Sequence, residues 1–399
     1  MKKNLLNVFL LLFVGVLFTQ CKKDEYEVIK ITKMISVEAM RALPVGVSKA
    51  IEAKKTGKIY IYNDYLLINE PYEGIHIYNN ANPSSPVNIA FLKIPGNVDL
   101  AVRNNILYAD SFIDLLAFDI SNMSSIKQVK RLNDVFKQVY STGVQKYLYY
   151  TKDTVVKKQR YTGVVDDISA YSSSSSQSGS SGQGGSMARF TLMNDYLYTV
   201  GMYELGLFDV KDASSPSYVK SINLGWGVET IFPYDNKLFI GTNTGMHIFN
   251  AVDAANPVKL STYSHVFACD PVVVQGKYAY VTLRTGTFCR QTVNQLEVVD
   301  IEDPTKPKQV ALYQMQNPHG LSISGNNLFL CEGNFGIKSF NISDNKAIGS
   351  NMLQHLQTVK SFDVIAGPKS LIVTGEDGVY QFNYSNASNL KQMSLIKVK

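Results

Sequence analysis

Residues 228–261 decide the fold, and they read VETIFPYDNKLFIGTNTGMHIFNAVDAANPVKLS. Four short strand-like runs stand in this stretch, at residues 228–232, 237–240, 245–250 and 257–261. Turn-forming residues bound each run, as is typical of short β-strands. The stretch therefore predicts four strands in one antiparallel sheet.

The same pattern returns from Gly57 to the C-terminus with a period of about forty residues. Four of its spacings are 41 residues: 66 to 107, 107 to 148, 197 to 238 and 238 to 279. Such a period, filled with short strands and turns, is typical of a propeller blade. We predict an all-β fold, a single β-propeller of four-stranded antiparallel blades over residues 56–399. The equivalent strand positions are Leu66, Leu107, Leu148, Leu197, Leu238, Ala279, Leu328 and Leu371.

The number of blades depends on the unit around Leu148. Residues 146–150, KYLYY, form a good second-strand pattern and keep the period. However, this unit has no proline turn, and it runs into a Ser/Gly-rich stretch that we expect to be a flexible insertion at residues 164–186. The sequence favours eight blades with this unit; seven is the alternative without it.

The exit from each third strand is the sharpest part of the repeat, as in residues 296–307, LEVVDIEDPTKP. An Asp or Asn at these positions can fold its side chain onto backbone donors further along, which closes the turn. The proline then begins an exposed outer strand, where a missing N–H has no cost. We therefore interpret these acids as structural and not catalytic.

This pattern resembles the LVIVD-repeat family of bacterial β-propellers, from Gly57 to Val398 apart from the insertion. The resemblance implies a propeller fold and export to the cell envelope. It implies no known activity.

The N-terminus has the features of a signal peptide at residues 1–20. A basic start precedes an apolar run at residues 5–18, which is too short for a spanning helix and suits a secretory signal. Residues 17–21, LFTQC, resemble the lipobox of bacterial lipoproteins, which implies that Cys21 is acylated, although Gln20 departs from the usual small residue. A plain signal peptide with an incidental cysteine is the alternative.

The segment at residues 21–55 is expected to be the acylated cysteine and its tether, with a short helix at residues 36–41. Its first residues, CKKDEY, resemble the export signal of Bacteroidetes lipoproteins. We expect a lipid anchor in the outer membrane and exposure at the cell surface. A periplasm-facing anchor is the alternative.

Charge and cysteines limit the possible partners. Charged residues are 18% of the chain and the net charge of +6 is spread along it, so we expect no nucleic-acid partner. Cys269 and Cys289 flank one strand hairpin and can form a disulfide in an oxidising compartment, while Cys331 is expected to be a buried small side chain. No metal-ligand spacing is present, so we expect no cofactor; a calcium ion held by several acids is the alternative.

The candidate binding site lies where the loops before the first strands gather at one mouth of the central channel. Glu229, Asp270 and His319 each stand nine residues before the marker of their blade, so they occupy matching positions. Polar groups that converge on a concave mouth are the usual mark of a binding site. The alternative is that they cap strand ends and bond neighbouring blades. The full rim set is Asp99, Arg189, Glu229, Asp270, His319 and Asp363.

Aromatic side chains extend this candidate site. Trp226 stands between two glycines in a loop before a first strand, where it could stack on a sugar or a peptide. Burial between blades is the alternative. Tyr72, Tyr203 and Phe335 lie between second and third strands and could widen the binding surface.

No catalytic motif is present: the chain has no Gly-x-Ser-x-Gly, no His-Glu-x-x-His and no Walker loop. We predict a non-catalytic propeller that binds a glycan, a peptide or an envelope protein. One alternative is a hydrolase or lyase that uses the rim acids with His319 as base. Another is a purely structural scaffold in an outer-membrane complex.

Overall fold

The structure is a computed structural model that describes residues 26–136, 140–142, 145–157, 183–265, 271–284 and 293–399. The chain divides into two compact units. The smaller comprises residues 1–42 and 139–166, and the larger comprises residues 43–138 and 167–399.

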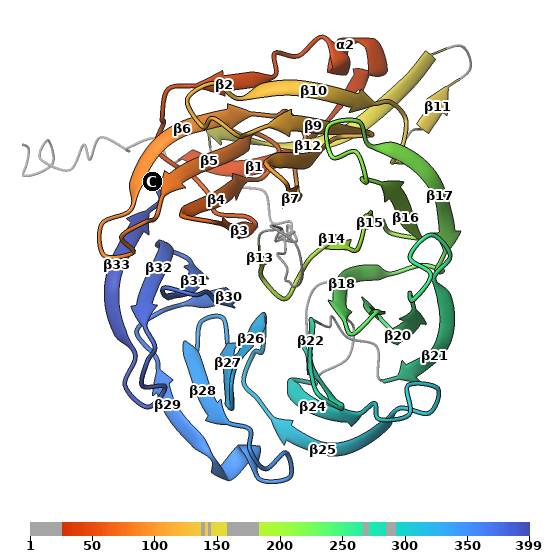
Figure 1. Cartoon of the computed structure of the whole chain (residues 1–399). Coiled ribbons are helices and arrows are strands. Elements are labelled where there is room, and N and C mark those ends of the chain that lie inside the picture. The colour runs from red at the N-terminus through yellow and green to blue at the C-terminus, as the bar shows by residue number, and fades with distance from the viewer. Residues whose placement is uncertain (1–25, 137–139, 143–144, 158–182, 266–270, 285–292) are drawn as a thin grey trace, which may run out of the picture. The chain divides into compact units, whose positions relative to one another are not determined.

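The larger unit is a seven-bladed β-propeller, because seven antiparallel sheets each contain four consecutive strands of the chain (Figure 1). In chain order and from the channel outward, the first three blades are β3 (Ile59–Tyr62), β4 (Tyr65–Glu70), β5 (Gly74–Asn79) and β6 (Val87–Lys93); β7 (Leu100–Arg103), β8 (Ile106–Ser111), β9 (Asp114–Asp119) and β10 (Lys127–Leu132); β14 (Phe190–Met193), β15 (Tyr196–Val200), β16 (Glu204–Asp209) and β17 (Ser217–Asn223). The last four are β18 (Val228–Tyr234), β19 (Lys237–Thr242), β20 (Gly245–Asn250) and β21 (Val258–Ser264); β22 (Val272–Gln275), β23 (Tyr278–Leu283), β24 (Gln295–Asp300) and β25 (Lys308–Gln314); β26 (Leu321–Ser324), β27 (Asn327–Cys331), β28 (Ile337–Asn341) and β29 (Met352–Leu356); β30 (Ser361–Ala366), β31 (Leu371–Gly375), β32 (Gly378–Asn383) and β33 (Lys391–Lys397).

Two short strands extend the first blade into a six-stranded sheet. β2 (Gly46–Ser48) pairs with β6 at the outer edge. β13 (Gln183–Gly184) pairs with β3 at the inner edge, so it lies at the centre of the ring (Figure 1).

The preference for eight blades was wrong, and the alternative of seven is correct. The unit around Leu148 lies in β12 (Gln145–Lys157), which pairs with β1 (Tyr26–Ser36) over the whole of β1. The other edge of β12 pairs with β11 (Tyr140–Thr142). Both edges of β12 are thus used in a three-stranded sheet of the smaller unit, and β12 cannot be the second strand of a blade.

A short helix follows β1 in the smaller unit, as the sequence predicts. α2 (Val37–Arg41) begins after Ser36, whose Oγ accepts a hydrogen bond from the Ala39 N–H at 3.1 Å. A serine at this position satisfies one of the free N–H groups of the first turn. The stretch at residues 21–55, expected as a tether, therefore contains β1, α2 and β2.

The turn between third and fourth strands confirms that its acids and amides are structural. In every blade, two Asp or Asn side chains three residues apart each accept a hydrogen bond from the N–H two residues further on, at 2.8–3.1 Å. These bonds close the turn locally, so it needs no support from another blade. The accepting pairs are Asn79 and Asn82, Asp119 and Asn122, Asp209 and Asp212, Asn250 and Asp253, Asp300 and Asp303, Asn341 and Asp344, and Asn383 and Asn386.

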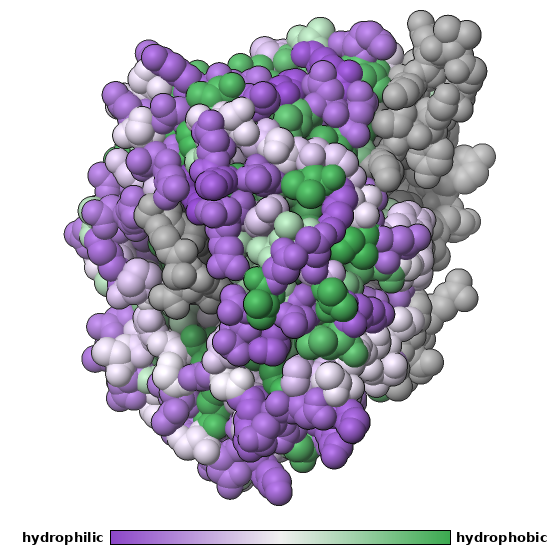
Figure 2. All heavy atoms as spheres, turned by 45° about the vertical axis from the view of Figure 1, so that its right-hand side comes forward, coloured by the Kyte–Doolittle hydropathy of each residue, from purple (hydrophilic) through white to green (hydrophobic). Residues whose placement is uncertain are grey.

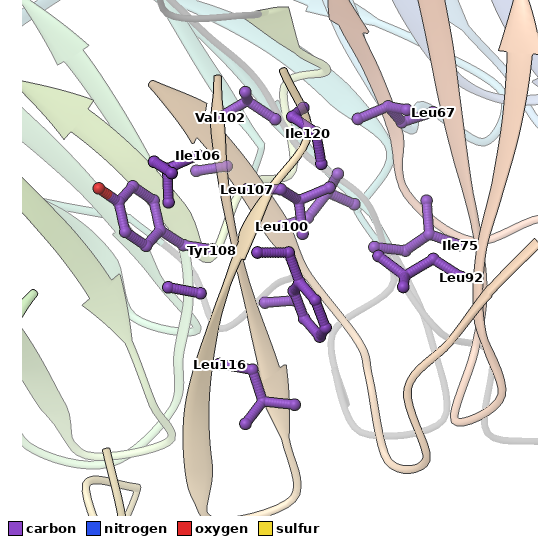
Figure 3. Close-up of a cluster of buried hydrophobic side chains, with 14 of the residues drawn as sticks. Leu67, Ile75, Leu92, Leu100, Val102, Ile106, Leu107, Tyr108, Leu116 and Ile120 are labelled. Atoms are coloured by element: carbon purple, nitrogen blue, oxygen red, sulfur yellow. The ribbon is translucent and has the colours of Figure 1, made fainter. Parts of the chain in front are cut away.

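The core lies between adjacent blades. Figure 3 shows side chains of the first blade, such as Leu67 and Ile75, next to side chains of the second, such as Leu100 and Leu107, and all four are at most 1% exposed. Burial of such side chains is the main favourable term in folding. Tyr108 also reaches the third blade, where its hydroxyl donates to the Ala213 carbonyl at 2.8 Å. Apolar packing and tyrosine hydrogen bonds together fix the angle between blades.

The ring closes without a shared blade, because the first and last blades each come from one continuous stretch. A buried amide pair joins them. Asn80 Nδ2 donates to Gln381 Oε1 at 3.0 Å, and Gln381 Nε2 donates to Asn80 Oδ1 at 2.7 Å. The Ser370 hydroxyl also donates to Gln381 Oε1, at 2.7 Å.

The outer strands carry scattered exposed apolar residues, such as Val87, Val258 and Leu312. Figure 2 shows one side of the molecule, where hydrophobic side chains form small patches among hydrophilic ones. Single exposed apolar residues are normal on a soluble protein surface.

Candidate functional site

The candidate site lies at the end of the propeller where the first strands begin, which we call the entry face. Because the strands of a blade are antiparallel, this end also carries the loop between the second and third strands. The rim residues that the structure describes and the aromatic residues predicted from sequence therefore belong to the same face.

A segment of the chain itself crosses the channel at the entry face. We call Gln183–Phe190 the channel segment; its residues Gly184–Ala188 are all buried. Through β13 it pairs with Tyr60 and Ile61 of the first blade. Its Ala188 carbonyl accepts a hydrogen bond from the Ile231 N–H of the fourth blade at 2.6 Å.

Ser186 anchors the middle of the channel segment to the sixth and seventh blades. Its Oγ accepts a hydrogen bond from the Leu321 N–H at 2.7 Å and donates to Asp363 Oδ1 at 3.3 Å. The hydroxyl is thus used both as donor and as acceptor, which fixes its orientation.

Asp99 binds the end of the channel segment from the second blade. Its Oδ2 accepts hydrogen bonds from the N–H groups of Arg189 at 2.7 Å and Phe190 at 3.2 Å, and its Oδ1 accepts from Leu100 at 2.7 Å. The carboxylate is 3% exposed, so these N–H groups replace water around it.

Lys58 completes the group from the first blade. It is 2% exposed, its Nζ donates to the Met187 carbonyl at 2.7 Å, and Nζ lies 3.7 Å from Asp99 Oδ2. Burial lowers the pKa of this ammonium to about 8, since the charged form loses water, and the Asp99 carboxylate offsets part of that effect.

Asp363 is the third buried charged group around the channel segment. It is fully buried, and its Oδ2 has no hydrogen-bond partner among the described residues. Burial raises the pKa of the carboxyl to about 7, against the opposing effects of the Val364 N–H bond and the Lys58 charge. Asp363 can lie against the main chain of residue 320 because that residue is glycine: a Cβ there would lie 2.1 Å from Asp363 Oδ1.

His319 is buried beside this group, and the described residues offer its ring no hydrogen-bonded acid. Its ring meets Phe362 edge to face with centroids 5.4 Å apart, and neither ring nitrogen has a hydrogen-bond partner within the described ranges. Burial, followed by the Arg284 charge, holds the pKa of the imidazole well below its usual range. Glu229 is therefore not hydrogen-bonded to His319, and Asp270 lies outside the described residues.

The structure thus brings Asp99 and Asp363 together around the channel segment, to which Arg189 itself belongs. Lys58, the partner of Asp99, was not predicted from the sequence. Its only signal was a lysine directly before the apolar strand β3, a position where a charge is unusual. The channel segment was not predicted either, because its small residues indicate a loop.

Trp226 is 53% exposed, in a loop whose backbone conformation is one that glycine allows on both sides of it. Gly225 and Gly227 have φ values of 86° and 89°, a region that favours glycine. A Cβ at Gly227 would also lie 2.2 Å from the Asn243 side chain. The conformation that exposes Trp226 therefore depends on these two glycines.

Met202 and Tyr203 lie in the neighbouring loop, and main-chain hydrogen bonds join the two loops. The Met202 carbonyl accepts from the Gly227 N–H at 3.1 Å and the Val228 N–H at 3.3 Å, and the Tyr203 carbonyl accepts from the Leu224 N–H at 2.8 Å. Met202 is 45% exposed and Tyr203 is 53% exposed. We call Met202, Tyr203 and Trp226 the aromatic platform.

Exposed aromatic side chains concentrate on the entry face. Six aromatic residues are 37% to 53% exposed among residues 34–136, 184–265, 271–284 and 293–399, where side-chain exposure is described, and five of them lie on this face. The sixth, Tyr218, lies on the outer strand β17. The five are Tyr72, Tyr203, Trp226, Phe335 and Phe362.

Tyr72 is held in a conformation that tyrosine rarely adopts, with φ at 67°. Two main-chain hydrogen bonds maintain it: the Tyr72 N–H donates to the Asn97 carbonyl at 2.7 Å, and the Gly96 N–H donates to the Tyr72 carbonyl at 2.8 Å. Such a backbone costs on the order of 1–3 kcal/mol, and observed strain of this kind is a reason to look for function.

The described residues offer few candidates for a metal site or for cysteine chemistry. Within the described ranges, no three His, Cys, Asp or Glu side chains gather closely enough to hold a metal ion. Cys331 is a buried free thiol, as expected. Cys21, Cys269 and Cys289 lie outside the described residues. Of the helices described, none has the length and apolar character needed to span a bilayer.

Comparison with known proteins supports the fold alone. No protein-family model and no curated protein matches the chain. Among solved structures, a protein from Lactobacillus plantarum is similar at 12% identity, over 86% of this chain and 97% of that one, with a TM-score of 0.54. A functionally unknown protein from Desulfotomaculum acetoxidans is similar at 9% identity over 84% and 95%, with a TM-score of 0.53. BamB from Moraxella catarrhalis is similar at 8% identity over 88% and 96%, with a TM-score of 0.51. At these identities the chain shares only an architecture with them, and its class is that of a seven-bladed β-propeller.

Proposed function

We propose that the protein is a lipoprotein of the outer membrane whose propeller binds a partner protein of the cell envelope and catalyses no reaction. The concentration of exposed aromatic residues on the entry face carries this proposal. Met, Tyr and Trp are enriched in protein interfaces, and Trp and Tyr are enriched among the residues that dominate binding energy.

The rigidity of the aromatic platform supports the proposal. Binding costs free energy when side chains and loops must be ordered, so a platform on fixed loops loses less. The two loops are already joined by three main-chain hydrogen bonds. The spread of Tyr72, Phe335 and Phe362 over other blades favours a broad protein surface over a single sugar.

The anchor part of the proposal depends on the sequence of residues 1–26. The signal-like start, Cys21 and the following acidic and basic residues favour acylation and surface export. Metabolic labelling with a clickable fatty acid tests it: the wild type should be labelled, and Cys21→Ala should not. An unlabelled wild type would remove the lipid anchor from the proposal.

Photo-crosslinking in intact cells tests the binding surface. A photoreactive residue at Thr244, which is exposed on the entry face beside the aromatic platform, should give one discrete protein adduct. The same residue at Val252, which is 72% exposed at the opposite end of the blade, should not.

The purified adduct partner then allows a quantitative test. Trp226→Ala should weaken its binding about 10- to 30-fold, as for a dominant interface side chain. Tyr218→Ala is the matched control, since Tyr218 is exposed but lies on an outer strand, and it should leave Kd unchanged. Equal effects of the two variants would refute the assignment. If crosslinking gives no protein adduct and a glycan array gives a hit that Trp226→Ala abolishes, the ligand is a glycan and not a protein.

A further inference from the structure

The channel mouth contains a second binding site, separate from the aromatic platform. We propose that it binds the main chain of an extended peptide of small residues, and that the chain's own channel segment, Gln183–Phe190, occupies it as an internal ligand. The inference goes beyond the proposed function and does not depend on it.

The contacts to the channel segment are mainly contacts to its backbone. Lys58 donates to the Met187 carbonyl, the Ile231 N–H donates to the Ala188 carbonyl, and β13 adds to the edge of β3. An extended peptide that adds to a sheet edge is recognised in this way, with affinity from main-chain hydrogen bonds.

The side chains of the channel segment explain which peptides fit. Gly184, Gly185 and Ala188 are buried, so small residues fill these positions of the channel segment. The Ser186 side chain makes hydrogen bonds, to the Leu321 N–H and to Asp363. A small-small-Ser-x-small sequence is therefore the expected ligand.

The charges in this site are difficult to explain by stability alone. Lys58, Asp99 and Asp363 are each at most 3% exposed, and buried ion pairs are often no more stabilising than apolar residues of the same size. Donors and acceptors of this kind are well suited to hold peptide N–H and C=O groups away from water. We therefore regard them as a preformed cradle for a main chain.

A labelled peptide with the sequence of residues 183–190, QGGSMARF, tests the proposal by fluorescence anisotropy on the full chain. Ser186→Glu should expel the channel segment, because a second carboxylate would be buried beside Asp363. This variant should bind the peptide at least about tenfold more tightly than the wild type, whose site is filled at an effective concentration in the millimolar range. Ser174→Glu, in the Ser-rich stretch of the insertion, is the matched control and should behave as wild type.

Two further arms establish where the peptide binds. Adding Asp99→Asn to Ser186→Glu should weaken binding, and a peptide with leucines in place of both glycines should not bind. A folded Ser186→Glu variant that fails to bind the peptide at about 1 mM would overturn the proposal, and so would equal binding to the wild type.

If Ser186→Glu does not fold, hydrogen exchange on the wild type decides. About 5 mM peptide should accelerate exchange of the Arg189 and Phe190 amides, which Asp99 protects, because the peptide competes for the same cradle. Unchanged exchange at these amides would then overturn the proposal.

Discussion

Substitution of Gln381 should show how strongly the seam between the first and last blades contributes to stability. Gln381→Met keeps the length of the side chain but removes its three hydrogen bonds to Asn80 and Ser370. Two amide atoms of Asn80 and the Ser370 hydroxyl then remain in the interior without these partners. Stranding a buried polar group costs about 1–3 kcal/mol, although relaxation recovers part of it, so we expect a loss of about 2–4 kcal/mol.

Urea denaturation followed by circular dichroism and by the fluorescence of Trp226 measures this loss. Coincident transitions from the two probes are needed for a two-state free energy of unfolding. Gln392→Met is the control, because Gln392 is exposed on β33 of the same blade, and its effect should stay within about 0.5 kcal/mol.

A double-mutant cycle with Asn80→Leu isolates the amide pair. When both residues are replaced, no amide of the pair is left without its partner. The free energy of unfolding of the double variant should therefore be about 1–3 kcal/mol higher than the two single losses added together predict. An additive cycle, or a Gln381→Met loss below about 0.5 kcal/mol, would refute the claim that this pair joins the ends of the ring.

Three further predictions concern the groups around the channel segment. Lys58→Met should lower the free energy of unfolding by about 3–5 kcal/mol, measured by urea denaturation, because it leaves the Asp99 and Asp363 carboxyls without their cation; an effect under about 1 kcal/mol would contradict the buried pair. The pKa of Asp363 rises from 3.8 to about 7 on folding, so between these pH values the folded state keeps a proton that the unfolded state has lost. The contribution of the protonated Asp363 to the free energy of unfolding is therefore present below pH 4 and is lost as pH rises to 7. The difference in unfolding free energy between wild type and Asp363→Asn should therefore shift steadily with pH across this window, and a difference independent of pH would be contrary evidence. Gly320→Ala should cost about 1–3 kcal/mol, because its Cβ would lie 2.1 Å from Asp363 Oδ1, whereas Gly201→Ala, with no neighbour nearer than 3.8 Å, should be tolerated; equal midpoints in thermal unfolding would disprove the steric argument.

Most of the fold could be predicted because the repeat is a local pattern. The markers in β4, β8, β15, β19, β23, β27 and β31 all lie in second strands and are buried. Leu148 keeps the same register but belongs to β12, since periodicity alone does not identify the pairing partner of a strand. The missing proline turn after this unit was the signal that it is not a blade.

The candidate site was predicted only in part. The offsets of Asp99 and Asp363 from their markers place both at the entry face. Their partner could not be found in the same way, because Gly184, Gly185 and Ser186 predict a flexible loop by composition, and only tertiary contacts order them. Trp226 between two glycines was correctly assigned to a loop, and its exposure favours the binding alternative over burial.

The ends of the propeller meet at one point of its circumference, where the Lys399 N–H donates to the Ala53 carbonyl at 3.1 Å. A mechanical load applied through residues 53 and 399 would therefore act directly across the junction of the first and seventh blades. The other six junctions are also spanned by the covalent chain and would be shielded. Under tension the ring should open first at this junction, where the Asn80–Gln381 hydrogen bonds oppose separation of the two blades.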